Sequence, residues 1–142
     1  MISYLQLERT AAGEIRSGDA VLFDNAPASG GDQISYNTST GEVVFGQAGY
    51  YYIDWFVAPQ FGLTTDGSNF AVVTSEDDPP MTGSSHVRVS PTIGFAVIDV
   101  TTPGKTVRLI NTSNGSIMLS QAVNIKAGLA VFSIAGPDAA LE

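Results

Sequence analysis

The sequence predicts an all-β protein made of packed antiparallel sheets, and three observations support this expectation. First, no stretch of about ten or more residues has the apolar spacing of an amphipathic helix. Second, short runs rich in Val, Ile, Tyr, Phe and Trp recur along the chain, and this composition is typical of strands. Third, turns with glycine, proline or Asn-Gly separate these runs at intervals of about 8–15 residues, as in sandwiches and barrels.

The composition fits one globular domain and argues against several classes of function. The chain has 142 residues, of which 44% are hydrophobic, so it can bury a core of its own. The formal net charge of −8 repels phosphate groups, so neither nucleic acid nor an anionic membrane surface is expected as a partner. No apolar run is long enough to insert across a membrane. Because the chain has no Cys, disulfides and cysteine-ligated metals are excluded.

The clearest strand signal lies in residues 40–59, where two apolar runs flank the turn formed by residues 46–49. In the second run the side chains alternate between two faces. One face consists of Tyr51, Ile53, Trp55 and Val57, and the other of Tyr50, Tyr52, Asp54 and Phe56. Both faces are largely apolar, whereas a strand with one solvated face would be polar on that side. We therefore expect the core to cover the first face and a partner surface to cover the second.

The other elements follow from the same signals. Residues 2–8 alternate weakly and form a possible first strand or an ordered lead-in. Strands are expected at residues 20–23, 34–36, 42–45, 50–57, 70–74, 86–90, 93–100, 106–111, 117–119 and 129–135. Strong turn signals separate several of them, including Asp66-Gly67 and Asn114-Gly115. Two packed sheets of such strands form a jelly roll, with the immunoglobulin-like sandwich as the nearest competitor.

Several motifs follow one another in an order that covers about residues 20–136. They are Val21–Asn25, Ile34–Asn37, Thr40–Phe45, Ala48–Val57, Gly94–Ile98, Pro103–Leu109 and Ala130–Ile134. This order resembles the C1q-like domain of the C1q/tumour necrosis factor superfamily. Within that superfamily it is most similar to the C-terminal domain of bacterial collagen-like glycoproteins on the spore surface, or exosporium. The chain departs from the family pattern at Gly104-Lys105, where an acidic Gly-Asp turn is common, and it contains no Gly-X-Y repeat.

The resemblance implies a ten-stranded antiparallel jelly roll that assembles as a homotrimer. One sheet of each subunit then faces the threefold axis, with the last strand beside the central one. For this chain the implied trimer interface comprises Tyr52, Asp54, Phe56, Leu129 and Val131. The implied core comprises Tyr51, Ile53, Trp55, Val57, Phe132 and Ile134.

The chain is expected to divide into three parts. Residues 1–19 form the lead-in with the possible first strand, residues 20–136 form the C1q-like domain, and residues 137–142 form a tail. The last two residues, Leu141-Glu142, are similar to an expression-vector remnant. The first residues lack the pattern of a signal peptide.

Few residues suggest catalysis or a cofactor. His86 is the only histidine and no Gly-x-Ser-x-Gly motif occurs, so no catalytic triad is expected. The run Glu76-Asp77-Asp78 could offer oxygen ligands to calcium, but consecutive carboxylates cannot all point at one ion, so a solvated loop is favoured. Asp54 could line the threefold axis, paired or bound to an ion, or lie at a solvated strand edge. The aromatic residues 50–56 could stack on a sugar, although core and subunit interface explain their alternation better.

The sequence therefore predicts a non-enzymatic protein without a cofactor. We expect a homotrimeric head of a collagen-like surface protein, extracellular or on a spore or cell surface. Such a head presents loops for adhesion or for recognition of a glycan or protein receptor. The alternative is a carbohydrate-binding or receptor-binding module such as a phage fibre tip.

Overall fold

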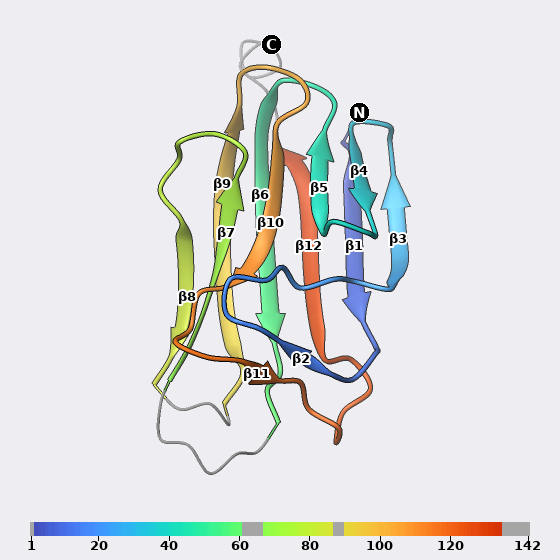
Figure 1. Cartoon of the computed structure of the whole chain (residues 1–142). Helices are drawn as coiled ribbons and strands as arrows, with labels where there is room; N and C mark the ends of the chain where they lie inside the picture. Colours follow the sequence, from blue (N-terminus) through green and yellow to red (C-terminus); the bar gives the residue numbers. More distant parts are fainter. Residues whose placement is uncertain (1, 61–66, 87–89, 135–142) are drawn as a thin grey trace.

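Two five-stranded antiparallel sheets pack face to face in a computed structural model of the chain (Figure 1). The structure describes residues 2–60, 67–86 and 90–134. The expected tail at 137–142, the turn residue Asp66 and residues 87–89 of the strand expected at 86–90 lie outside these ranges. Within the described ranges there is no helix, and hence none that could cross a membrane.

The first sheet, here called the β6 sheet, contains the longest strands. Its order is β3 (Asn25–Gly30), β1 (Tyr4–Arg9), β12 (Ala127–Ile134), β6 (Gly49–Val57) and β9 (Thr92–Val100). Strands far apart in the sequence are neighbours in this sheet, because β12 pairs with β1 on one side and with β6 on the other. The possible first strand of the lead-in is therefore an interior strand of the sheet, paired on both sides.

The second sheet, here called the β10 sheet, lies in front of the β6 sheet in Figure 1. Its order is β4 (Ile34–Asn37), β5 (Glu42–Phe45), β10 (Thr106–Asn111), β7 (Ser68–Thr74) and β8 (Met81–Ser85). A short pair, β2 (Glu14–Ile15) with β11 (Ile117–Met118), lies across the lower end in this view. The predicted all-β jelly roll with ten main strands is confirmed.

Two main strands, β3 and β8, lie where the sequence predicted turns and loops and no strand. Residues 20–23 contribute only an isolated bridge between Ala20 and Ile110, whereas β3 covers residues 25–30. This segment lacks strand-forming side chains and contains Pro27. It can pair because it is an edge strand, and the register with β1 shifts around Pro27, where a proline is tolerated.

The core between the sheets is organised around the buried side of β6. As predicted, Tyr51, Ile53, Trp55 and Val57 are all buried, with at most 1% of their surface exposed. The indole of Trp55 packs edge-on against Phe70, with ring centroids 6.3 Å apart. The Tyr51 hydroxyl donates a hydrogen bond of 2.7 Å to the Gln47 carbonyl, so this buried phenol is satisfied.

The predicted faces of the last strand are wrong. Leu129 and Val131, expected at an interface, are in the core, and Phe132 and Ile134, expected in the core, are each 41% exposed. The pairing of Val131 with Ile53 and of Phe132 with Tyr52 fixes these faces, because directly paired residues share one side of a sheet. An error of one residue inverts every assignment on a strand. Because both sides of β12 carry apolar residues, its local pattern does not indicate which side is buried.

A methyl group at Gly94 should destabilise the fold. The Cβ atom of an alanine there would overlap the Trp55 ring, and such overpacking costs about 1–3 kcal/mol. At Gly46 the added Cβ would lie 3.6 Å from the Gln33 carbonyl oxygen, an ordinary contact. We expect Gly94→Ala to lower the free energy of unfolding in urea, followed by Trp55 fluorescence, and Gly46→Ala to change it little. Equal effects at both positions would contradict this packing.

Candidate functional site

The side of the β6 sheet that points away from the core is covered with apolar groups. The strand register arranges them in rows that cross β1, β12, β6 and β9 in that order. The first row is Tyr4, Phe132, Tyr52 and Val97; the second is Gln6, Ala130, Asp54 and Phe95; and the third is Glu8, Gly128, Phe56 and Ile93. We call these three rows, together with Tyr50 and Ile134 beyond the first row, the apolar face.

The apolar face is unusually exposed. Phe95 is 68% exposed, Ile93 67% and Val97 56%, and Tyr4, Tyr50, Phe132 and Ile134 are each about 40% exposed or more. Together these seven residues form one exposed surface that spans four neighbouring strands, whereas exposed hydrophobic residues on a soluble monomer are normally scattered singly. A surface of this size indicates an interaction site.

Aromatic rings hold one another in place at the centre of this face. The Tyr52 ring is stacked with Phe95 at a centroid distance of 6.4 Å and is tilted against Phe132 at 5.4 Å. Rings from three neighbouring strands therefore form a continuous surface. Such offset pairs are favourable beyond the area they bury, so the surface is formed before any partner binds.

The ionisable groups in the three rows, tyrosines aside, are both carboxylates. Glu8 accepts a hydrogen bond of 3.1 Å from the Asn25 amide. Asp54 is exposed and forms no hydrogen bond or ion pair with any part of the chain that the structure describes. It lies between Ala130 and Phe95 in the middle row. A partner that covered this face would have to accommodate or protonate this carboxylate.

The predicted interface residues fall into two groups. Tyr52, Asp54 and Phe56 lie on the apolar face, whereas Leu129 and Val131 do not. The prediction missed the most exposed residues of the face, Ile93 and Phe95 on β9. The sequence did carry a signal for them, because residues 93–98 are apolar on both sides of the strand, just as residues 50–57 are.

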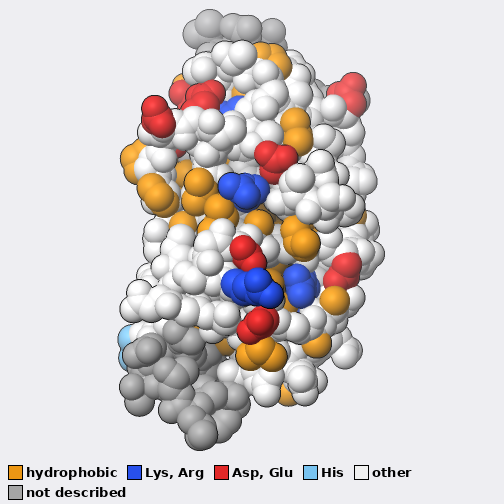
Figure 2. All heavy atoms as spheres, viewed as in Figure 1, with side chains coloured by type: hydrophobic (Ala, Val, Ile, Leu, Met, Phe, Trp, Pro, Cys, Tyr) orange, Lys and Arg blue, Asp and Glu red, His pale blue; other side chains and the backbone are white. Residues whose placement is uncertain are grey.

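The opposite side of the molecule has a different character. Figure 2 shows this side, with the β10 sheet in front, and acidic and basic side chains lie among scattered hydrophobic ones. Outside the strands of the β6 sheet, the exposed large hydrophobic side chains are Ile2, just before β1, and Leu22, Met118 and Val123, which lie in separate segments. No strand of the described β10 sheet contributes to this group.

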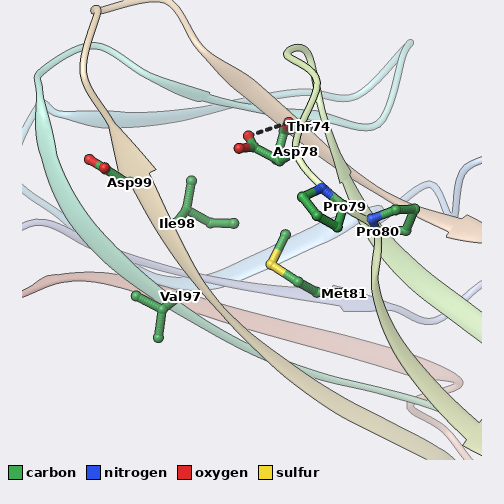
Figure 3. Close-up of a pocket in the computed structure, with 8 residues that line it drawn as sticks. All are labelled: Thr74, Asp78, Pro79, Pro80, Met81, Val97, Ile98 and Asp99. Atoms are coloured by element: carbon green, nitrogen blue, oxygen red, sulfur yellow. Dashed lines mark hydrogen bonds between the residues drawn. The ribbon is translucent and has the colours of Figure 1, made fainter.

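A pocket of about 250 Å³ lies beside the apolar face, between β9 and the loop that joins β7 to β8 (Figure 3). It is lined by Thr74, Asp78, Pro79, Pro80, Met81, Val97, Ile98 and Asp99. Figure 3 shows the two prolines and Met81 on one side and the β9 residues on the other, with Asp78 turned towards Thr74. The walls are mostly apolar and the acidic groups come from both sides.

A buried lysine neutralises the acidic loop at this pocket. Lys105 is only 6% exposed, and its Nζ lies 2.7 Å from Asp78 Oδ2 and 3.6 Å from Glu76 Oε1. It also donates a hydrogen bond of 2.8 Å to the Asp99 carbonyl. Two carboxylates of the run at residues 76–78 are thus directed at an ammonium group. In the described ranges no three acidic or histidine side chains are grouped as metal ligands.

The pKa values of Asp78 and Lys105 shift in the directions that an ion pair requires. Hydrogen bonds from Lys105 and then from Thr74 hold the pKa of Asp78 below its ordinary value. Burial acts to lower the pKa of Lys105, but the hydrogen bond and charge of Asp78, with the charge of Glu76, outweigh it and leave the pKa raised. Lys105 is the residue at which the chain departs from the acidic family turn, and the structure gives it this role.

Neither a family model nor a curated protein matches the sequence. Three solved structures each match 94% of the chain. The globular domain of zebrafish complement 1qA protein is 12% identical with a TM-score of 0.70 over 98% of its own length, and murine APRIL at pH 8.5 is 13% identical with a TM-score of 0.68 over 100% of its length. The PRD1 vertex protein P5 is 14% identical with a TM-score of 0.63 over 97% of its length. At such low identity the likeness concerns the fold. The chain has the jelly-roll fold of C1q-like and tumour necrosis factor-like domains.

The ion pair of Asp78 should make stability depend on acid. Because the pKa of Asp78 in the folded protein lies below its ordinary value of 3.8, its contribution is present above that pH and is lost as the pH falls through the folded-state pKa. We expect Asp78→Asn to lower the melting temperature at pH 6 and to flatten its fall below pH 4. Asp77→Asn, in the same loop but without an ion pair to any described residue, is the control and should behave like the wild type. If the melting temperatures of wild type and Asp78→Asn fall in the same way below pH 4, the stabilising ion pair between Asp78 and Lys105 is refuted.

Proposed function

We propose that this protein is a non-enzymatic globular head that assembles as a homotrimer through the apolar face. The observation that carries the proposal is the apolar face itself, on which seven large hydrophobic residues of one sheet are exposed. Burying apolar surface is the main favourable term in most protein association. A second copy of the chain carries the same apolar face and can therefore cover the first.

The number of copies and the location rest on other grounds. The motif order and the shared fold support a closed trimer with the β6 sheets facing the axis. We propose an extracellular or surface location, with the head at the end of a collagen-like protein of a bacterial spore or cell, on the resemblance of the motifs alone. In this arrangement the loops at the ends of the sheets would be free to contact a receptor.

A carbohydrate-binding or receptor-binding module is the second candidate, and the pocket beside β9 favours it. Its volume of about 250 Å³ is slightly below the usual range for small-molecule sites, and its apolar walls carry a few polar groups. The aromatic run of β6 does not support sugar stacking in the way the sequence suggested, because Tyr51 and Trp55 are buried. A ligand in the pocket is compatible with assembly, since only Val97 belongs to both surfaces.

The assembly can be tested by measuring mass in solution. We expect native mass spectrometry and light scattering at micromolar concentration to give three times the 14.8 kDa of one chain. Phe132→Glu places a charge at the centre of the face, where covering it would cost several kcal/mol, so this variant should be monomeric. Met118→Glu, at an exposed hydrophobic residue on β11, should remain trimeric. A monomeric wild-type protein would disprove the proposal.

Asp54 offers a test of how the interface treats a carboxylate. Packing against another copy would remove water from this group without supplying a described counter-charge, which is unfavourable for the ionised form. We therefore expect Asp54→Asn to strengthen association at pH 7, seen as a lower dissociation midpoint in a dilution series. Asp19→Asn, at an exposed carboxylate next to the bridge between Ala20 and Ile110 of the β10 sheet, controls for the change in net charge. Weaker association of Asp54→Asn would mean that the carboxylate has a partner in the assembly, such as a bound cation.

A further inference from the structure

We propose that the apolar face carries both halves of the subunit contact, with Phe95 of one copy inserting into a hollow over β12 of the next. This inference rests on the proposed assembly and specifies which residues meet within it. It derives from the relief of the face, which protrudes at β9 and is recessed at β12.

The hollow exists because two positions of β12 carry almost no side chain. Gly128 and Ala130 point to the apolar face, where the neighbouring strands carry Glu8, Phe56 and Asp54. These residues, with Gln6 and Ile125, surround an open space of about 120 Å³. The Phe56 ring lies so close over Gly128 that a Cβ atom there would be 2.6 Å from its Cε1 atom. The absence of a side chain at Gly128 therefore allows the Phe56 ring to pack against the backbone of β12 and to form a wall of the hollow.

The protrusion lies on β9, at the edge of the same sheet. Phe95 and Ile93 are the most exposed large hydrophobic side chains of the described residues. Phe95 shares its row with Asp54 and Ala130, so the protrusion and the hollow are two strands apart. At about 4.8 Å per strand the separation is about 10 Å, too far for Phe95 to fill the hollow of its own chain.

The ring and the hollow agree in size and in charge. An apolar cavity of about 150 Å³ accommodates one benzene molecule, so an open hollow of about 120 Å³ suits one phenyl ring. Glu8 and Asp54 lie at its rim, and the edge of an aromatic ring carries partial positive charge. A phenylalanine that enters with its edge towards these carboxylates offsets part of the cost of removing them from water, whereas another carboxylate would be repelled.

The separation of the two features also suits a closed ring of copies. When a protrusion and its receiving hollow lie at different places on one chain, each copy can give to one neighbour and receive from the other. If the rotation closes after three copies, all three protrusions and all three hollows are used. This is the arrangement in which no protruding Phe95 stays in water.

A double-mutant cycle tests the contact directly. Phe95→Ala removes the ring and Ala130→Phe fills the hollow, and we expect each to raise the dissociation midpoint of the trimer at least tenfold in sedimentation or mass photometry. In the double variant the phenyl ring is on β12 and the space that receives it is on β9. We therefore expect the dissociation midpoint of the double variant to be at least tenfold lower than the value obtained by multiplying the two single fold-changes. Met118→Ala and Ser35→Phe, away from the face, control for lost and added bulk and should leave the midpoint unchanged.

The outcomes separate this inference from the proposed assembly. A trimeric wild type for which the two single effects multiply without coupling, or for which Ala130→Phe has no effect, overturns the contact and leaves the assembly standing. A monomeric wild type overturns both. If Ala130→Phe lowers the melting temperature of the monomer, Ala130→Leu replaces it in the same cycle with the same expected coupling to Phe95→Ala.

Discussion

The backbone pairing of β6 with β12 on one side and β9 on the other fixes the orientation of three strands at once. Because Trp55 and its alternate neighbours are held in the core, the register determines which residues of β9 and β12 join them and which are left outside. The buried core and the apolar face are therefore two results of one set of hydrogen bonds. Neither could change by a single residue without exchanging with the other.

Local sequence signals were sufficient for most of the fold. Strand-forming residues between glycine turns predicted β5, β6, β9, β10 and β12 close to their observed places. They failed at β3, because a segment such as residues 25–30 becomes a strand only when β1 offers it an unpaired edge. They failed also on the two sides of β12, where Leu129 and Phe132 are equally apolar and only the distant partner strand decides which is buried.

The candidate site was predictable on β6 and not beyond it. Tyr52 and Phe56 were identified because alternation within one strand places them opposite the core. The greater exposure of Phe95 depends on the position of β9 at the edge of the sheet, which no local pattern states. The pairing of Lys105 with Asp78 joins two loops through the fold, so the acidic run alone could be interpreted only as solvated or metal-binding.

In the proposed contact Asp54 determines which arrangement of copies is favoured. A wholly apolar face could pack against another copy in many registers of similar energy. The net negative charge of the chain repels another copy at long range and does not distinguish between these registers. A carboxylate between Phe95 and Ala130 penalises every register that places it against the rings of the first row. A single polar residue in an apolar seam fixes register at a cost in stability in coiled coils, and the same physics applies to a sheet. The face would thus give up some affinity in exchange for one arrangement of copies.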